Sequence, residues 1–95
     1  NIYPQEIDDV LLAHQSVAEV CCIGVPNEEW GEEVKAVINL ESGADEDAVR
    51  KELVQLAEEK LSGFKKPKTY EFWTEELPRL PTGKIQRNLV KKRFW

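Results

Sequence analysis

The chain has 95 residues, of which 41% are apolar and 33% are charged, and its formal net charge at pH 7 is −5. Such a length and composition are typical of one small, soluble globular domain. No apolar run approaches the roughly 18 residues that a membrane span needs, and a single histidine without any Cys-x-x-Cys spacing gives no support to a metal site.

The chain opens with a predicted helix. Pro4 stands in its first turn, where a missing amide hydrogen costs nothing. Four residues then recur at the spacing of one buried helical stripe: Ile7, Val10, Leu11 and His14. Because His14 belongs to that stripe, we interpret it as a structural residue and not a catalytic one.

Two strands are predicted next. Residues 17–26 form a near-continuous apolar run, typical of a strand that is buried on both faces, and residues 26–29 supply a turn. Residues 34–40 alternate, which predicts a half-buried strand that pairs antiparallel with the first. One of its faces carries Val34, Ala36, Ile38 and Leu40, and the other carries Lys35, Val37 and Asn39.

The only two cysteines, Cys21 and Cys22, are adjacent in the first predicted strand. Their side chains point to opposite faces of a strand, so a disulfide between them would be strained. We therefore expect reduced thiols and a reducing compartment, the cytoplasm.

A second helix and a short strand follow. Acidic residues load the first turn of the helix at positions 45–47, as its dipole favours, and its buried stripe comprises Val49, Leu53, Leu56, Ala57 and Leu61. Gly63 is predicted to end this helix, and Pro67 to prevent its continuation. Residues 70–73 form a third strand, with Tyr70 and Phe72 on one face, and a basic helix begins at about Ile85. The expected fold is one α+β domain over residues 1–95, with a short, mainly antiparallel three-stranded sheet flanked by helices in the order αββαβα.

Residues 77–85 form a stiff loop that presents one lysine. Their sequence is Leu-Pro-Arg-Leu-Pro-Thr-Gly-Lys-Ile, in which Pro78 and Pro81 exclude both a helix and a central strand. Gly83 permits a turn that residues with a Cβ resist. Lys84 is therefore positioned to bring positive charge to a phosphate or a carboxylate. The spacing of a nucleotide-binding P-loop is absent, because Lys84 is followed by isoleucine.

Four segments of the chain resemble parts of the C-terminal domain of the adenylate-forming enzymes, and they follow one another as they do in that family. The family is a superfamily of acyl- and aryl-CoA synthetases, peptide-synthetase adenylation domains and luciferases. The Lys84 loop and the basic helix resemble the last core motif of that family. Residues 1–7 resemble the segment after its inter-domain hinge, residues 17–32 its first C-terminal hairpin, and residues 61–68 its Phe/Tyr-Lys-x-Pro-Lys element. The resemblance covers essentially the whole chain and is best for the acyl-CoA synthetases.

The resemblance implies a reaction in two steps. A carboxylic acid and ATP give an acyl-adenylate and pyrophosphate, and CoA then displaces AMP. Lys84 matches the family's lysine that bridges the carboxylate and the α-phosphate, a role that suits a compact ammonium. The implied ligands are ATP and CoA, with Mg²⁺ bound outside this chain, because the family's phosphate loop, ATP-binding aspartate and hinge residue would lie upstream of Asn1. We therefore expect a mobile lid domain that is inactive alone and works with its own N-terminal domain.

The resemblance also implies a surface that faces CoA after a large rotation of the domain. Trp30 and Gly31 would border the pantetheine tunnel. Phe64, Lys65 and Lys66 would lie near the CoA nucleotide, with adenine on the ring and phosphates on the lysines. Two ordinary alternatives stay open: Trp30 covers its own hairpin, and the lysines are simply solvated.

Charge is segregated along the chain. Residues 1–64 carry 4 basic and 15 acidic side chains, whereas residues 65–95 carry 9 basic and 3 acidic ones. The basic end favours an anionic ligand such as ATP or CoA, and it leaves open a non-catalytic module that binds an acidic partner or nucleic acid. Nucleic acid is the weaker choice, because aromatic residues are not interleaved with the basic ones. A peptide-synthetase adenylation domain is a further alternative, which the CoA-type Phe-Lys-Lys-Pro-Lys segment disfavours.

Overall fold

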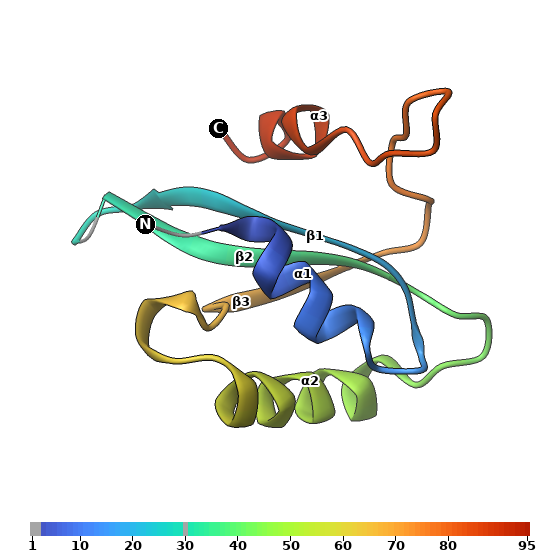
Figure 1. Ribbon diagram of the computed structural model, residues 1–95, viewed down its shortest axis with the longest axis horizontal. Coiled ribbons are helices and arrows are strands. Elements are labelled where there is room, and N and C mark those ends of the chain that lie inside the picture. The colour runs from blue at the N-terminus through green and yellow to red at the C-terminus, as the bar shows by residue number, and fades with distance from the viewer. Residues whose placement is uncertain (1–2, 30) are drawn as a thin grey trace.

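A computed structural model describes residues 3–29 and 31–95. The described residues form a small α+β domain, and their elements follow one another in the predicted order (Figure 1). The elements are α1 (Pro4–Leu12), β1 (Val17–Asn27), β2 (Gly31–Leu40), α2 (Glu46–Lys60), the 3₁₀ turn η1 (Gly63–Lys65), β3 (Thr69–Trp73) and α3 (Arg87–Lys92). The expected fold class is confirmed.

The described residues form a three-stranded sheet in the order β1-β2-β3. β1 and β2 run antiparallel, with Val20 opposite Ile38, whereas β2 and β3 run parallel, with Ile38 opposite Phe72. The antiparallel ladder is the longer of the two, so the sheet is mixed and mostly antiparallel. β1 lies at one edge, where one side of its backbone is open to other partners.

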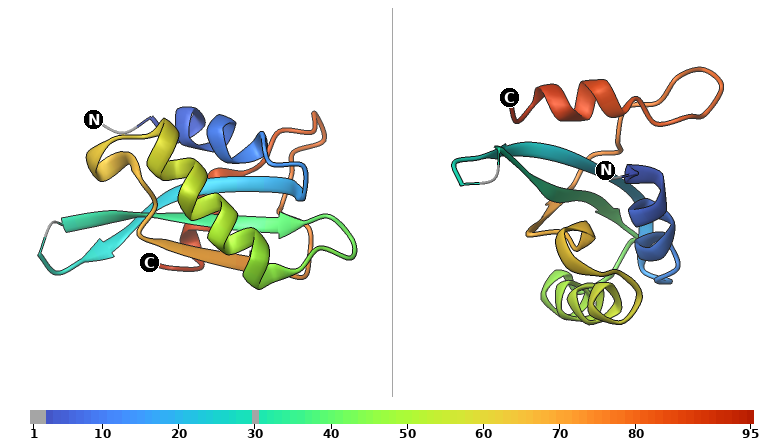
Figure 2. Two further views of the ribbon diagram at one scale, coloured as in Figure 1. Left: turned by 90° about the horizontal axis from the view of Figure 1, so that it is seen from below. Right: turned by 60° about the vertical axis from the view of Figure 1, so that its left-hand side comes forward.

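Helices cover both faces of the sheet, as Figures 1 and 2 show: α1 and α2 lie on one face, and α3 lies on the other. The core under α1 and α2 contains Ile7, Leu11, Val17, Val20, Cys22, Val34, Ala36, Ile38, Val49, Leu53, Ala57 and Leu61. A second core lies under α3 and contains Cys21, Ile23, Val25, Val37, Leu77 and Val90. We call these the first core and the second core.

The prediction that the second strand is half-buried is wrong. Val37 lies on the face of β2 opposite the first core, yet it is fully buried among second-core residues that include Leu77 and Val90. The strand also begins at Gly31, three residues earlier than expected. The alternating pattern was misleading because the residues that cover this face come from a distant part of the chain.

Two helix boundaries also differ from the prediction. α2 ends at Lys60 because Leu61 is already extended and buried, so Gly63, whose φ is +57°, belongs to η1 and does not cap the helix. α3 begins at Arg87 and not at Ile85, because Ile85 pairs with Arg79 in an isolated antiparallel bridge.

The interpretation of His14 as structural is supported by its contacts. Its Nδ1 accepts a hydrogen bond from the backbone N–H of Ser16 (3.0 Å), and its Nε2 lies 2.6 Å from Glu52 Oε1, which joins the end of α1 to α2. Cys21 and Cys22 are both free and buried. None of the helices in the described residues is long and apolar enough to cross a membrane.

Candidate functional site

The predicted Lys84 loop is a small β-hairpin, residues 78–86, which we call the Lys84 hairpin. The N–H of Leu80 donates to the C=O of Lys84 (2.8 Å), and the N–H of Gly83 donates to the C=O of Leu80 (2.8 Å). Gly83 has a φ of +95°, which a residue with a Cβ adopts only with strain. Pro81 occupies the second position of the turn that these bonds close, where its fixed φ is favoured. The segment is therefore ordered by its own backbone.

Apolar side chains on either side of the turn attach the Lys84 hairpin to the sheet. Leu77, directly before the hairpin, is 3% exposed and belongs to the second core. Ile85 packs against the same core after the turn, and Val90 of α3 is fully buried in it. Both ends of the hairpin are thus held against one face of the sheet.

A buried carboxylate on β1, that of Glu19, binds the arm of the hairpin that enters the turn. Side chains alternate along a strand, so Glu19 shares its face with Cys21 and points toward the C-terminal segment. Its Oε1 accepts the N–H of Leu77 (2.9 Å), and its Oε2 accepts the Nε–H of Arg79 (2.7 Å). Arg79 also donates to the C=O of Gly83, so this one carboxylate reaches the tip of the hairpin through its arginine.

A second buried carboxylate, that of Asp8, binds Arg87, which follows the arm that leaves the turn. Asp8 of α1 accepts the Nη2–H of Arg87 on Oδ2 (2.7 Å) and the backbone N–H of Cys22 on Oδ1 (2.7 Å). Arg87 in turn donates from Nη1 to the C=O of Cys22 (2.6 Å). These bonds satisfy both peptide groups of Cys22 on the open edge of β1.

The Asp8 carboxylate keeps Arg87 charged in this partly buried place. Burial lowers the pKa of the Arg87 guanidinium, but the hydrogen bond and the charge of Asp8 outweigh that effect and leave the pKa above its ordinary value. Asp8 and Arg87 are therefore an ion pair, and so are Glu19 and Arg79.

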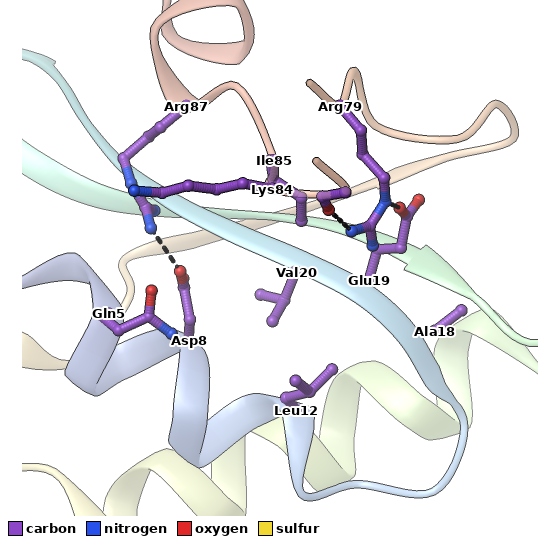
Figure 3. Close-up of a pocket in the computed structure, with 11 residues that line it drawn as sticks. Gln5, Asp8, Leu12, Ala18, Glu19, Val20, Arg79, Lys84, Ile85 and Arg87 are labelled. Carbon is purple, nitrogen blue, oxygen red and sulfur yellow. Dashed lines mark hydrogen bonds and ion pairs between the residues drawn. The ribbon is translucent and has the colours of Figure 1, made fainter. Parts of the chain in front are cut away.

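Lys84 lies between these two ion pairs, beside a cavity of about 220 Å³ that α1, β1 and the hairpin enclose. In the view of Figure 3 its side chain crosses the space between the pair Glu19–Arg79 and the pair Asp8–Arg87. The Lys84 side chain is exposed, and its ammonium forms no hydrogen bond or ion pair with any residue that the structure describes. The two neighbouring cations are neutralised within the domain, whereas the charge of Lys84 is available to an external anion.

Most of the residues predicted to face CoA lie at the other end of the molecule. Figure 1 shows the tip of the β1–β2 hairpin and η1 on one side, and the Lys84 hairpin on the opposite side. Gly31 begins β2 with a φ of +82° and is exposed, and the N–H of Lys68 donates to the C=O of Val34 (2.8 Å), which sets the segment after η1 beside β2. Phe64 is 64% exposed. Trp30 lies outside the described residues.

Lys65 and Lys66 are not simply solvated. Lys65 Nζ lies 3.2 Å from Glu6 Oε1, and Lys66 Nζ lies 2.7 Å from Glu58 Oε2. A phosphate that binds either lysine must compete with a carboxylate of the same domain.

Much of the positive charge at the basic C-terminal end is paired within the domain. Within the described part of the chain, at least five of the nine basic residues of positions 65–95 pair with carboxylates: Lys65, Lys66, Arg79, Arg87 and Arg93. This pairing disfavours a module that binds nucleic acid through a basic tail. No group of three or more His, Cys, Asp or Glu side chains among residues 3–29 and 31–95 is arranged to hold a metal ion.

Sequence reasoning missed the four residues of the two ion pairs. One signal was available: Glu19 is the only charged residue in the apolar run 17–26, and a charge in such a run needs a partner. Asp8 gives no comparable signal, because it lies off the predicted apolar stripe of its helix, where a charged residue is ordinary.

The model of the family described as the AMP-binding enzyme C-terminal domain matches residues 6–84 of the chain. Among curated proteins, the chain is 40% identical over 95 residues to the fatty acid–[acyl-carrier-protein] ligase ScoC of Streptomyces coeruleorubidus, covering 100% of the chain and 18% of that protein. It is 42% identical over 87 residues to a long-chain-fatty-acid–CoA ligase of Bacillus subtilis, covering 92% of the chain and 15% of the relative.

Solved structures agree with these relatives. A fatty acyl CoA synthetase of Mycobacterium tuberculosis superposes with a TM-score of 0.84 at 36% identity, covering 99% of this chain and 18% of that one. The anthranilate CoA ligase AuaEII, solved in complex with anthranoyl-AMP, superposes with a TM-score of 0.89 at 32% identity, covering 98% and 18%. The chain thus spans less than a fifth of the length of the relatives it matches.

Proposed function

The chain belongs to the family of AMP-binding enzyme C-terminal domains, and we propose that it serves a larger, ATP-dependent acid–CoA ligase as its mobile lid. In that enzyme a carboxylic acid and ATP give an acyl-adenylate and pyrophosphate, and CoA then displaces AMP to give the acyl-CoA. The names of its relatives, which include fatty-acid ligases, support an acid as the substrate. The activity is a property of the larger chain, to which this domain contributes one charged group and one surface.

The charged group is Lys84, which we assign to the adenylation step. Attack of a carboxylate on the α-phosphate brings two anions together and develops further negative charge on the phosphoryl oxygens. An ammonium held between them offsets the repulsion and orients the reactants. The observation that carries this proposal is the arrangement at the hairpin: among the three cations that line this cavity, Lys84 is the one without an ion-pair partner in the described residues, and it stands on a turn that two ion pairs with buried carboxylates fasten.

The surface is the opposite end of the domain, which we assign to CoA. Gly31 and Phe64 are exposed there, with Lys65 and Lys66 beside them and Trp30 next in sequence to Gly31. One domain cannot present both ends to the same active site in one orientation, so the two steps require a rotation between them. ATP and CoA are the ligands of this proposal, and Mg²⁺ would bind the ATP outside this chain.

The test measures both half-reactions on Lys84→Ala in the full-length protein. Loss of one fixed donor at a centre of developing charge costs about 2.7–4 kcal/mol, so we expect acid-dependent pyrophosphate exchange to fall roughly 100- to 1000-fold. CoA thioester formation from chemically supplied acyl-adenylate should stay near normal. Lys92→Ala, which removes an exposed lysine without an ion pair in the described domain, is the control. An equal loss in both half-reactions would show that Lys84 supports the fold or the domain interface.

A carrier-protein thiol in place of CoA is the second candidate acceptor. It is favoured by the similarity to a ligase named for an acyl-carrier protein and by the carboxylates that already hold Lys65 and Lys66. Offering CoA and a phosphopantetheinylated carrier protein to the same acyl-adenylate complex distinguishes the two acceptors.

A further inference from the structure

We propose that Glu19 and Asp8 are positioning residues for Lys84, each acting through the arginine that it holds. The inference rests on the proposed function, because it assigns these carboxylates to the adenylation step. Neither carboxylate contacts Lys84 within ion-pair distance. Their effect on the reaction would come from fixing the two arms of the hairpin that carries it.

Glu19 fixes the arm that enters the turn. The carboxylate is 8% exposed and uses both of its oxygens, one for the backbone of Leu77 and one for the side chain of Arg79. Arg79 passes the constraint to the C=O of Gly83, directly before Lys84. Two charge-assisted hydrogen bonds, Glu19 to Arg79 and Arg79 to Gly83, therefore connect β1 to the residue before Lys84. Such bonds are stronger than neutral hydrogen bonds.

Asp8 fixes the arm that leaves the turn. It is 7% exposed, and it too uses both oxygens, one for the backbone of Cys22 and one for Arg87, which follows Lys84 by three residues. Arg87 also donates to the C=O of Cys22, so α1, β1 and the start of α3 meet at one point. The Lys84 main chain is thus held from both sides against the same strand.

The two carboxylates are suited to this task in a way that their amides are not. A carboxylate offers two acceptor oxygens, whereas an amide offers one acceptor and one donor group. Glu19→Gln and Asp8→Asn must therefore give up either the backbone contact or the arginine contact. The apolar anchors Leu77, Ile85 and Val90 are untouched by either change, so we expect the variants to fold with a looser hairpin.

The experiment uses Glu19→Gln and Asp8→Asn in the full-length protein, with Glu46→Gln as the matched control. Glu46 pairs with Arg50 (3.2 Å) on α2, away from the hairpin. We expect at least about a tenfold loss of acid-dependent pyrophosphate exchange in the first two variants and less than a twofold change in thioester formation from supplied acyl-adenylate. Amide hydrogen exchange in residues 78–86 should be faster in both variants. The control should leave pyrophosphate exchange, thioester formation and amide hydrogen exchange unchanged. Equal losses in the two half-reactions would overturn the proposal.

A double variant tests whether Glu19 acts through Arg79. If it does, Glu19→Gln combined with Arg79→Gln should lose no more adenylation than the worse single variant, whereas independent effects would multiply.

The hydrogen-exchange readout separates this proposal from the proposed function. If Lys84→Ala leaves adenylation intact, the function is wrong. The positioning of Lys84 is then judged by exchange alone: faster exchange in Glu19→Gln and Asp8→Asn, but not in the control, supports it, and unchanged exchange overturns it.

Discussion

Lys66 is held by a carboxylate of its own domain, Glu58, at 2.7 Å. Both side chains are partly exposed, and such pairs contribute about 0–1 kcal/mol because water and salt screen them. A phosphate dianion is a stronger competitor for the ammonium than water is, so if CoA binds at this end of the domain as proposed, its phosphate displaces Glu58 at a modest cost. The pair would then lower the affinity for CoA slightly while it keeps the lysine in place.

Removing that competitor should tighten CoA binding. In the full-length protein we expect Glu58→Gln to lower the KM for CoA by up to about fivefold, which corresponds to about 1 kcal/mol. Pyrophosphate exchange should not change, because Lys66 lies at the end of the domain away from Lys84. Glu59→Gln is the matched control: it removes the same charge from the next residue, which makes no ion pair with the described residues. A KM that falls equally in both variants would mean that only the general field of the surface had changed.

At the scale of one element, β1 carries both cysteines of the chain, and both are buried. It places Cys22 in the first core and Cys21 in the second, and its open edge is covered by side chains from α1 and α3. Trp95 continues that cover, since its Nε1–H donates to the C=O of Gly24 (2.8 Å). An edge strand whose outward peptide groups are already bonded is a poor template for aggregation.

The burial of β1 should make both thiols unreactive in the folded domain. Desolvation raises the pKa of Cys21 to about 11, against the opposing charge of Arg87, and raises that of Cys22 well above its ordinary value, with Asp8 adding to the effect. Iodoacetamide at pH 8 should therefore label neither cysteine of the 95-residue chain until a denaturant is added. Labelling at the rate of an unfolded peptide thiol would contradict the burial.

The same shift makes folding sensitive to alkali. A thiol whose folded pKa lies above its unfolded value of 9.0 stabilises the fold fully below pH 9, and this stability is lost as the pH rises through 11. Cys21 alone should lower the free energy of unfolding by about 3 kcal/mol over that range. Urea denaturation at pH 8 and at pH 10.5, compared with Cys21→Ser, measures the part of this contribution that is lost by pH 10.5, about 2 kcal/mol.

For the whole molecule, the important feature is the separation of its two candidate surfaces. The Lys84 hairpin and the end that carries Gly31 and Phe64 lie on opposite sides of the domain (Figure 1). A variant at one end should therefore disturb one half-reaction and spare the other.

Phe64→Ala should produce the reverse of the Lys84→Ala phenotype. If the exposed ring stacks on the adenine of CoA, its loss costs about 1–2 kcal/mol, so the KM for CoA should rise roughly 5- to 30-fold with pyrophosphate exchange unchanged. The control is Val54→Ala, which shortens an exposed apolar side chain on α2 instead of η1. An unchanged KM for CoA would show that Phe64 does not stack on the adenine.

Much of this domain could be predicted because the evidence for it is local in the sequence. The order of the elements follows from apolar periodicities of about 3.6 and 2, which depend on neighbours within a turn or a pleat. The stiffness of the Lys84 loop follows from Pro78, Pro81 and Gly83, which restrict the backbone wherever they stand. The resemblance to the adenylate-forming enzymes is likewise a property of short motifs in a fixed order, and the match of residues 6–84 confirms it.

Only the tertiary structure decided what covers the second face of the sheet and what holds Lys84. Val37 is buried by residues about 40 to 50 positions further along the chain, and the carboxylates find their arginines across 60 residues for Glu19 and 79 for Asp8. These contacts depend on the register of β1 and on the face to which α3 returns. Periodicity cannot report either of them, because it describes which face of an element is apolar and not which distant segment will cover it.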